Sequence, residues 1–133
     1  MIRRLGRAAV QAAPAALVAL LFLACPAALL AHAIVLESFP AHDATLARAP
    51  GHVMLRFNVQ IEKRLTRVTL TAADGVPLPV SIATRGAEAE AVDRLVIPLR
   101  PLGPGTYVLR YRVLALDGHI TEGALRFTVS AEQ

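Results

Sequence analysis

The stretch TYVLRYRVLALDGHITEGALRFTVS, residues 106–130, decides the fold. Apolar side chains occupy every second position in its first and last parts, while arginine and threonine fill many of the positions between. This alternation predicts two half-buried β-strands, residues 106–114 and 124–130. Polar residues and glycine separate them, so we expect the strands to pair as a hairpin around residues 115–123.

The same period of two continues on the N-terminal side of the hairpin. Residues 53–59 show it most clearly, because Val53, Leu55 and Phe57 alternate with more polar neighbours. Shorter candidate strands cover residues 33–38, 68–72, 76–83 and 95–99, with turn residues such as Asp74-Gly75 between them. Seven strands in about a hundred residues predict an all-β, seven-stranded Greek-key β-sandwich. Residues 85–93 are expected to form a mobile connection rather than a helical turn.

The first thirty residues have a different composition. Arg3, Arg4 and Arg7 precede a nearly unbroken apolar run over residues 12–30, and small residues follow it. This order predicts a signal peptide over residues 1–31 and an exported domain over residues 32–133. Two alternatives stay open, because the run is also long enough for a retained membrane anchor, and Cys25 weakly matches the acylated cysteine of a lipoprotein.

The cleavage position matters for the chemistry of the exported domain. A cut before His32 would make that histidine the first residue, whereas a cut after Ala33 fits the preference for small residues at −3 and −1 better and would discard His32.

Charge and cysteine content exclude several functions. The formal charge is +4, but three arginines lie in the predicted signal peptide and all the acidic residues lie beyond it, which leaves the exported domain near neutrality. No basic stripe points to nucleic acid. Cys25 is the one cysteine, so the exported domain has neither a disulfide nor a thiol nucleophile, and no serine lies in a Gly-x-Ser-x-Gly context.

Three residues are candidates for a metal site: His32, Asp117 and His119. A terminal His32 offers both its α-amine and its ring to one ion, and the i, i+2 spacing of Asp117 and His119 places their side chains on one face of an extended backbone. Three nitrogens and one oxygen suit tetragonal Cu(II). Taken separately, Asp117-Gly118-His119 also fits a plain turn, and His32 fits a surface residue.

A family resemblance joins these motifs. His32 followed by Ser38-Phe39-Pro40-Ala41, then Gly105-Thr106-Tyr107, Tyr111-Arg112-Val113, Asp117-Gly118-His119, Gly123 and Phe127-Thr128-Val129, resembles the opening and the ending of the CopC family in order and spacing. The resemblance covers essentially all of residues 32–130.

The resemblance implies a periplasmic β-sandwich of cupredoxin-like or immunoglobulin-like topology that carries copper. It assigns the Cu(II) ligands to His32, Asp117 and His119, and it implies a CopD-like copper permease of the inner membrane as partner. We expect a monomeric copper carrier or buffer in copper homeostasis or resistance, and not an enzyme.

This sequence departs from the family pattern in two ways. Val59 stands where some members have a glutamate, and Met54 is the one methionine after the initiator, so no Cu(I) thioether site is expected. His42 and His52 are interpreted as surface residues. The alternative functions are a metal-free immunoglobulin-like interaction module and, less well supported by this short tryptophan-free chain, a copper mono-oxygenase-like enzyme.

Overall fold

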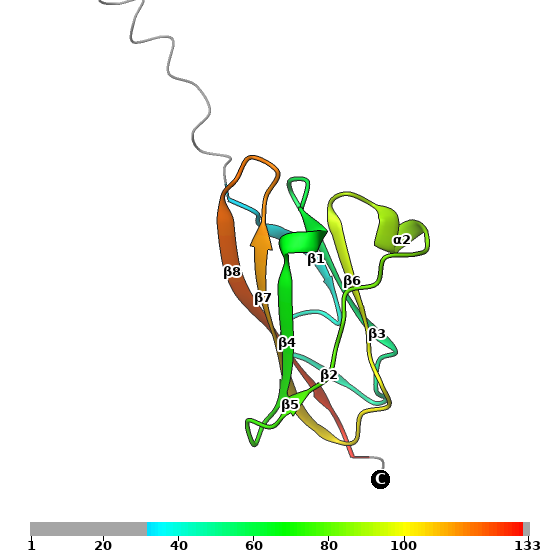
Figure 1. The fold of residues 1–133 in the computed structure, drawn as a ribbon. Helices are drawn as coiled ribbons and strands as arrows, with labels where there is room; N and C mark the ends of the chain where they lie inside the picture. The colour runs from blue at the N-terminus through cyan, green and yellow to red at the C-terminus, as the bar shows by residue number, and fades with distance from the viewer. Residues whose placement is uncertain (1–31, 132–133) are drawn as a thin grey trace, which may run out of the picture. The chain divides into compact units, whose positions relative to one another are not determined.

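Two β-sheets packed face to face form the domain in the computed structural model, which describes residues 32–131 (Figure 1). The three-stranded sheet has the order β1 (Val35–Phe39), β3 (His52–Phe57) and β6 (Arg94–Pro98). The five-stranded sheet has the order β2 (Ala44–Leu46), β8 (Ile120–Val129), β7 (Gly105–Leu114), β4 (Arg67–Ala72) and β5 (Pro77–Leu78). This arrangement confirms the predicted all-β sandwich.

The core lies between the sheets because alternate residues of the longer strands face inward. In β3, Val53, Leu55 and Phe57 are at most 1% exposed, while the residues between them reach solvent. The other sheet supplies the same pattern from β7 and β8, which bury Leu109 and Phe127 completely. Period-two alternation in the sequence therefore becomes one apolar layer shared by both sheets.

The hairpin predicted from the opening stretch is confirmed. β7 and β8 pair antiparallel over their full length, from Gly105 opposite Val129 to Leu114 opposite Ile120. Residues 115–119 make the connection. The Tyr111 ring packs over the Cα of its cross-strand partner Gly123 and stands edge-on to Phe57, with ring centroids 5.8 Å apart.

The described residues contain eight strands, one more than the sequence predicted. The additional strand, Ala44–Leu46, runs parallel to the end of β8, and three residues are too few to display an alternation. The predicted strand over residues 76–83 shrinks to Pro77–Leu78. Pro77 and Pro79 have no amide hydrogen to donate to a sheet, which accounts for the early end.

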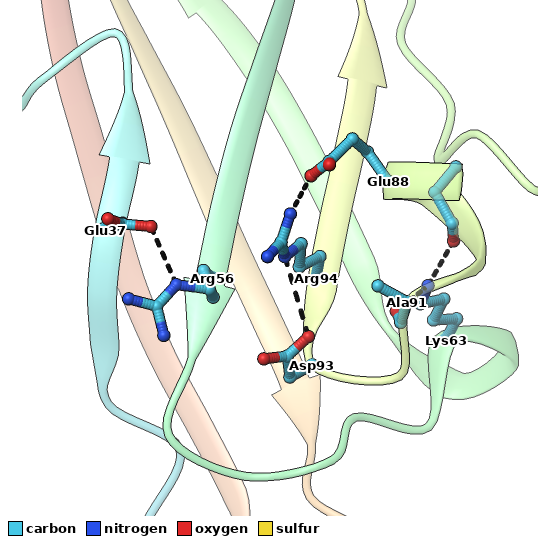
Figure 2. A network of polar contacts seen from close by, with 8 residues as sticks. Glu37, Arg56, Lys63, Glu88, Ala91, Asp93 and Arg94 are labelled. Atoms are coloured by element: carbon cyan, nitrogen blue, oxygen red, sulfur yellow. Dashed lines mark hydrogen bonds and ion pairs between the residues drawn. The ribbon is translucent and has the colours of Figure 1, made fainter. Parts of the chain in front are cut away.

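The expectation of a connection without helix over residues 85–93 is wrong at Ala87–Glu90, which forms the one-turn helix α2. Alanine and glutamate favour helix, and the Lys63 ammonium donates to the carbonyls of Ala89 and Ala91 at its end (Figure 2). Lys63 belongs to the 3₁₀ turn η2 (Lys63–Leu65). The contact ties η2 to α2.

The predicted signal peptide, residues 1–31, lies outside the described residues together with Cys25. Over residues 32–131, the structure contains no helix that is both long and apolar enough to span a membrane.

Candidate metal centre

The structure brings His32 and His119 together. Their rings stand edge-on with centroids 6.0 Å apart, although one histidine precedes β1 and the other lies in the connection between β7 and β8. Both residues are exposed. The two ends of the predicted ligand set are therefore neighbours at the surface.

The connection between β7 and β8 is a tight turn that fixes Asp117 beside His119. The Ala115 amide donates to the His119 carbonyl at 2.8 Å, and the Gly118 amide donates back to the Ala115 carbonyl at 2.9 Å. Gly118 has φ of 94°, a conformation that side chains other than glycine rarely adopt. The tight turn points the Asp117 carboxylate at the imidazole: Oδ1 lies 3.2 Å from Nδ1 of His119.

Asp117 is held in its ionised form. The backbone amide of His119 donates to Oδ1 at 3.1 Å and is the main cause of a pKa of Asp117 below its ordinary value; the His119 side chain adds to the effect. An ionised carboxylate is the form that ligates a metal ion. The Asp117 and His119 side chains are 45% and 53% exposed, so an ion can reach both.

A backbone clamp positions the segment that carries His32. Asn58 accepts from the Ile34 amide through its side-chain Oδ1 at 2.7 Å, and its own amide donates to the Ile34 carbonyl at 3.0 Å. The Thr121 hydroxyl accepts from the Ala33 amide at 3.2 Å. These bonds connect the first described residues to the end of β3 and the start of β8. The backbone is therefore held at Ala33 and Ile34, the two residues that follow His32.

The clamp was not foreseen from the sequence. Asn58 follows β3, and Thr121 is the second residue of β8. No sequence pattern at either position distinguishes a residue that holds another segment from an ordinary polar surface residue. The contacts depend on which strand ends meet in the folded sandwich.

The predicted ligands are adjacent but are not gathered around one point. Within residues 32–131, no group of three or more histidine, cysteine or acidic side chains is arranged to hold a metal ion. Asp117 contacts His119 directly instead. Both side chains are about half exposed, which leaves them room to rotate about their side-chain bonds.

The remaining residues singled out in the sequence lie elsewhere. The His42 ring accepts from the Arg126 amide at 3.3 Å and lies 3.4 Å from the Asp43 carboxylate. The exposed His52 packs its ring against Phe39, with centroids 5.2 Å apart. The interpretation of both histidines as surface residues is confirmed. Val59 is partly buried and packs against the core.

Comparison with known proteins gives concordant results. The CopC domain profile matches residues 35–130. Copper resistance protein C of Xanthomonas campestris pv. juglandis is 32% identical over 103 residues, covering 74% of this chain and 80% of the relative. Protein YobA of Escherichia coli K12 is also 32% identical, over 102 residues, covering 74% of this chain and 79% of the relative.

Solved structures agree with the sequence relatives. CopC from Methylosinus trichosporium OB3b superposes with a TM-score of 0.69 at 27% identity, covering 77% of this chain and 97% of that protein. PcoC, a methionine-rich copper resistance protein from Escherichia coli, superposes with a TM-score of 0.62 at 30% identity, covering 75% of this chain and all of PcoC. The strand framework, the sequence identity and the profile match all lead to one assignment: the chain belongs to the CopC family.

Proposed function

We propose that this protein is an exported, periplasmic Cu(II) carrier in copper homeostasis or resistance. One ion binds at the β7–β8 end of the domain, through the α-amine and ring of an N-terminal His32 together with Asp117 and His119. Membership of a family that includes copper resistance proteins supports copper as the bound metal. The single observation that carries the site is the approach of the His32 ring to the His119 ring, with Asp117 beside them.

The donor set favours Cu(II) over other ions. One amine, two imidazoles and one carboxylate suit the tetragonal geometry of Cu(II), which also binds most tightly among the divalent first-row metals. Cu(I) prefers thioether and thiolate donors. Met54, the one methionine of residues 32–131, lies on β3 in the three-stranded sheet. The site we propose is therefore a Cu(II) site.

Exposure of the ligands supports a carrier rather than a structural metal centre or an enzyme. A buried structural site would exchange its ion slowly, whereas Asp117 and His119 are about half exposed. Loading and release at an open site need only side-chain rotation. A carboxylate as the fourth ligand closes the coordination plane, which argues against the oxygen chemistry of a mono-oxygenase.

The proposal includes a partner and an assembly state. Copper released at this end of the domain has to pass to another protein, and a CopD-like permease of the inner membrane is the partner that the family resemblance implies. The carrier is proposed to act as a monomer, because all the named ligands come from one chain.

The test is a metal titration of the exported protein after its first residue has been identified by intact mass. One Cu(II) ion is expected per chain, with a spectroscopic signature of nitrogen and oxygen ligation. His119→Ala should remove most of the affinity, whereas His52→Ala, a matched loss of an exposed imidazole on the other sheet, should leave it unchanged. Equal affinity in the two variants would contradict the proposed ligand set and would favour the metal-free interaction module.

A further inference from the structure

The outer face of the five-stranded sheet carries unbalanced positive charge. Arg67 on β4 lies directly opposite Arg112 on β7, and Arg110 lies opposite Thr69 on the same two strands. These side chains line a shallow groove of about 300 Å³. Like charges directly opposite each other in a sheet are destabilising, so the protein maintains this pair at some cost to its stability.

Only one of the three arginines has an acidic partner. Glu122 on β8 lies 3.3 Å from Arg112. Within residues 32–131, neither Arg67 nor Arg110 has a carboxylate within ion-pair distance, and Arg110 makes only a long 3.4 Å contact with the Thr71 hydroxyl. The groove thus presents two exposed guanidinium groups to solvent.

The arginines of the three-stranded sheet provide a comparison, because both have carboxylates within ion-pair distance. Arg56 on β3 pairs with Glu37 at 2.8 Å, and Arg94 on β6 pairs with Glu88 and lies 3.8 Å from Asp93 (Figure 2). Each sheet-face arginine there has a carboxylate within reach. On the five-stranded sheet Arg126 is also paired, with the Asp43 carboxylate at 2.6 Å, so within residues 32–131 the absence of such partners is specific to Arg67 and Arg110 in the groove.

Exposed apolar side chains gather at the end of the sandwich that this groove adjoins. We call this the hairpin end; it comprises the segment 115–120, η2, residues 58–62 and the residues hydrogen-bonded to them, Ile34 and Val92 (Figure 1). Backbone hydrogen bonds connect its segments: Leu116 to Gln60, and Ile61 to Val92. Of the eight large apolar side chains exposed in the described residues, five are here: Ile34, Leu65, Val92, Leu116 and Ile120.

We propose that the hairpin end and the adjoining arginine groove form a docking surface for anionic phospholipid. The aliphatic side chains would enter the boundary between headgroups and acyl chains, while Arg67, Arg110 and Arg112 pair with lipid phosphates. This proposal is independent of whether copper binds at His32 and His119, and it adds a location to the proposed function: the metal-carrying end would face the membrane.

Two properties of the surface favour lipid over a soluble acidic partner. Each of the five aliphatic side chains is at least half exposed, which costs free energy in water. Contact with an apolar layer would remove this cost, and such a layer needs no shape complementary to the protein. Stable attachment to a bilayer takes two signals, and here apolar side chains stand next to basic ones. The attraction of each arginine to an anionic surface is screened by salt, so attachment should be reversible and sensitive to salt.

Sedimentation with vesicles tests this surface on the exported protein. Vesicles of phosphatidylglycerol and phosphatidylcholine should bind it in low salt, pure phosphatidylcholine should bind it much less, and 0.5 M NaCl should release it. The double variant Arg67→Gln/Arg110→Gln should lower the partition coefficient by roughly ten- to thirtyfold. The control Arg85→Gln/Arg100→Gln removes the same charge from exposed positions outside the groove and should change little.

Each outcome separates the possible occupants. Equal loss in both double variants would show attraction to net charge alone and would overturn the docking surface. Binding to native membranes but not to pure lipid vesicles would contradict the lipid proposal and would indicate that the docking partner is a membrane protein. Binding of inorganic phosphate in the groove without vesicle binding would reduce the groove to a small-anion site. Copper titration of the Arg67→Gln/Arg110→Gln variant, expected to match wild type, keeps this test separate from that of the metal site.

Discussion

The ring of His32 stands edge-on to the ring of His119, with centroids 6.0 Å apart, at the end of the sandwich where the chain enters β1 and turns between β7 and β8. Residues from the two ends of the domain sequence therefore meet at one point of its surface. The segment that follows His32 is held by hydrogen bonds to Asn58 and Thr121, and we expect these bonds to keep the two rings close.

Loss of the Asn58 acceptor should weaken Cu(II) binding without unfolding the domain. Asn58→Ala removes the 2.7 Å bond from the Ile34 amide, and one hydrogen bond is worth about 1 kcal/mol, so we expect a loss of affinity of several-fold up to about tenfold. Asn58→Asp retains an acceptor oxygen and should retain most of the affinity. Competitive titration, with the electron paramagnetic resonance spectrum of bound Cu(II), measures both.

A matched control separates positioning from general stability. Thr106→Ala breaks the 3.1 Å hydroxyl pair with Thr128, which lies towards the opposite end of the β7–β8 hairpin. This variant should lose stability in denaturant to a degree similar to Asn58→Ala while its Cu(II) affinity stays unchanged. An equal loss of affinity in the two variants would mean that the clamp has no specific role.

Gly123→Ala should destabilise the domain by about 1–3 kcal/mol, the usual cost of overpacking. A Cβ at this position would lie 2.8 Å from Cε2 of Tyr111 and closer still to its Cζ and hydroxyl oxygen. The free energy of unfolding in urea measures the cost. In a Tyr111→Leu background the same substitution should cost much less; an unchanged cost would show that the ring is not the obstacle.

Acidification should reduce stability through the Glu37–Arg56 pair. The hydrogen bond from Arg56 is the main cause of a pKa of Glu37 below its ordinary value of 4.5. The unfolded state then binds a proton more readily than the folded state, so the contribution is present above pH 4.5 and is lost as pH falls through the lower folded pKa.

The thermal midpoint measures this loss between pH 6 and pH 3. It should fall less in Glu37→Gln than in wild type, because the variant has no carboxyl group to protonate at this position. Since Glu37 is exposed, the difference is expected to be small. A steeper fall in the variant would contradict the assignment.

The long strands were predictable from the sequence because their period is visible over many residues. The predictions for β3, β7 and β8 agree with the structure to within a few residues, since each has alternating positions that face one shared core. β2 was missed and the strand near Pro77 was overextended, because a three-residue strand and a proline-limited strand are set by their neighbours.

The candidate site was only partly predictable. The spacing of Asp117 and His119 indicates that they share a turn, but nothing local indicates that His32 lies beside them; the family resemblance supplied that pairing. The Asn58 and Thr121 contacts arise from strand ends that become neighbours only after folding. The groove that Arg67 of β4 shares with Arg110 of β7 likewise depends on the register of the two strands.

The N-terminal amine of His32 is the part of the proposed site that one added residue can remove. A chain beginning at His32 should bind one Cu(II) tightly in competitive titration. The same chain with a single alanine before His32 keeps every side chain but converts the amine to an amide, and its affinity should fall at least about a hundredfold, on the order of 3 kcal/mol. Affinities that agree within about twofold would contradict a site built on the terminal His32.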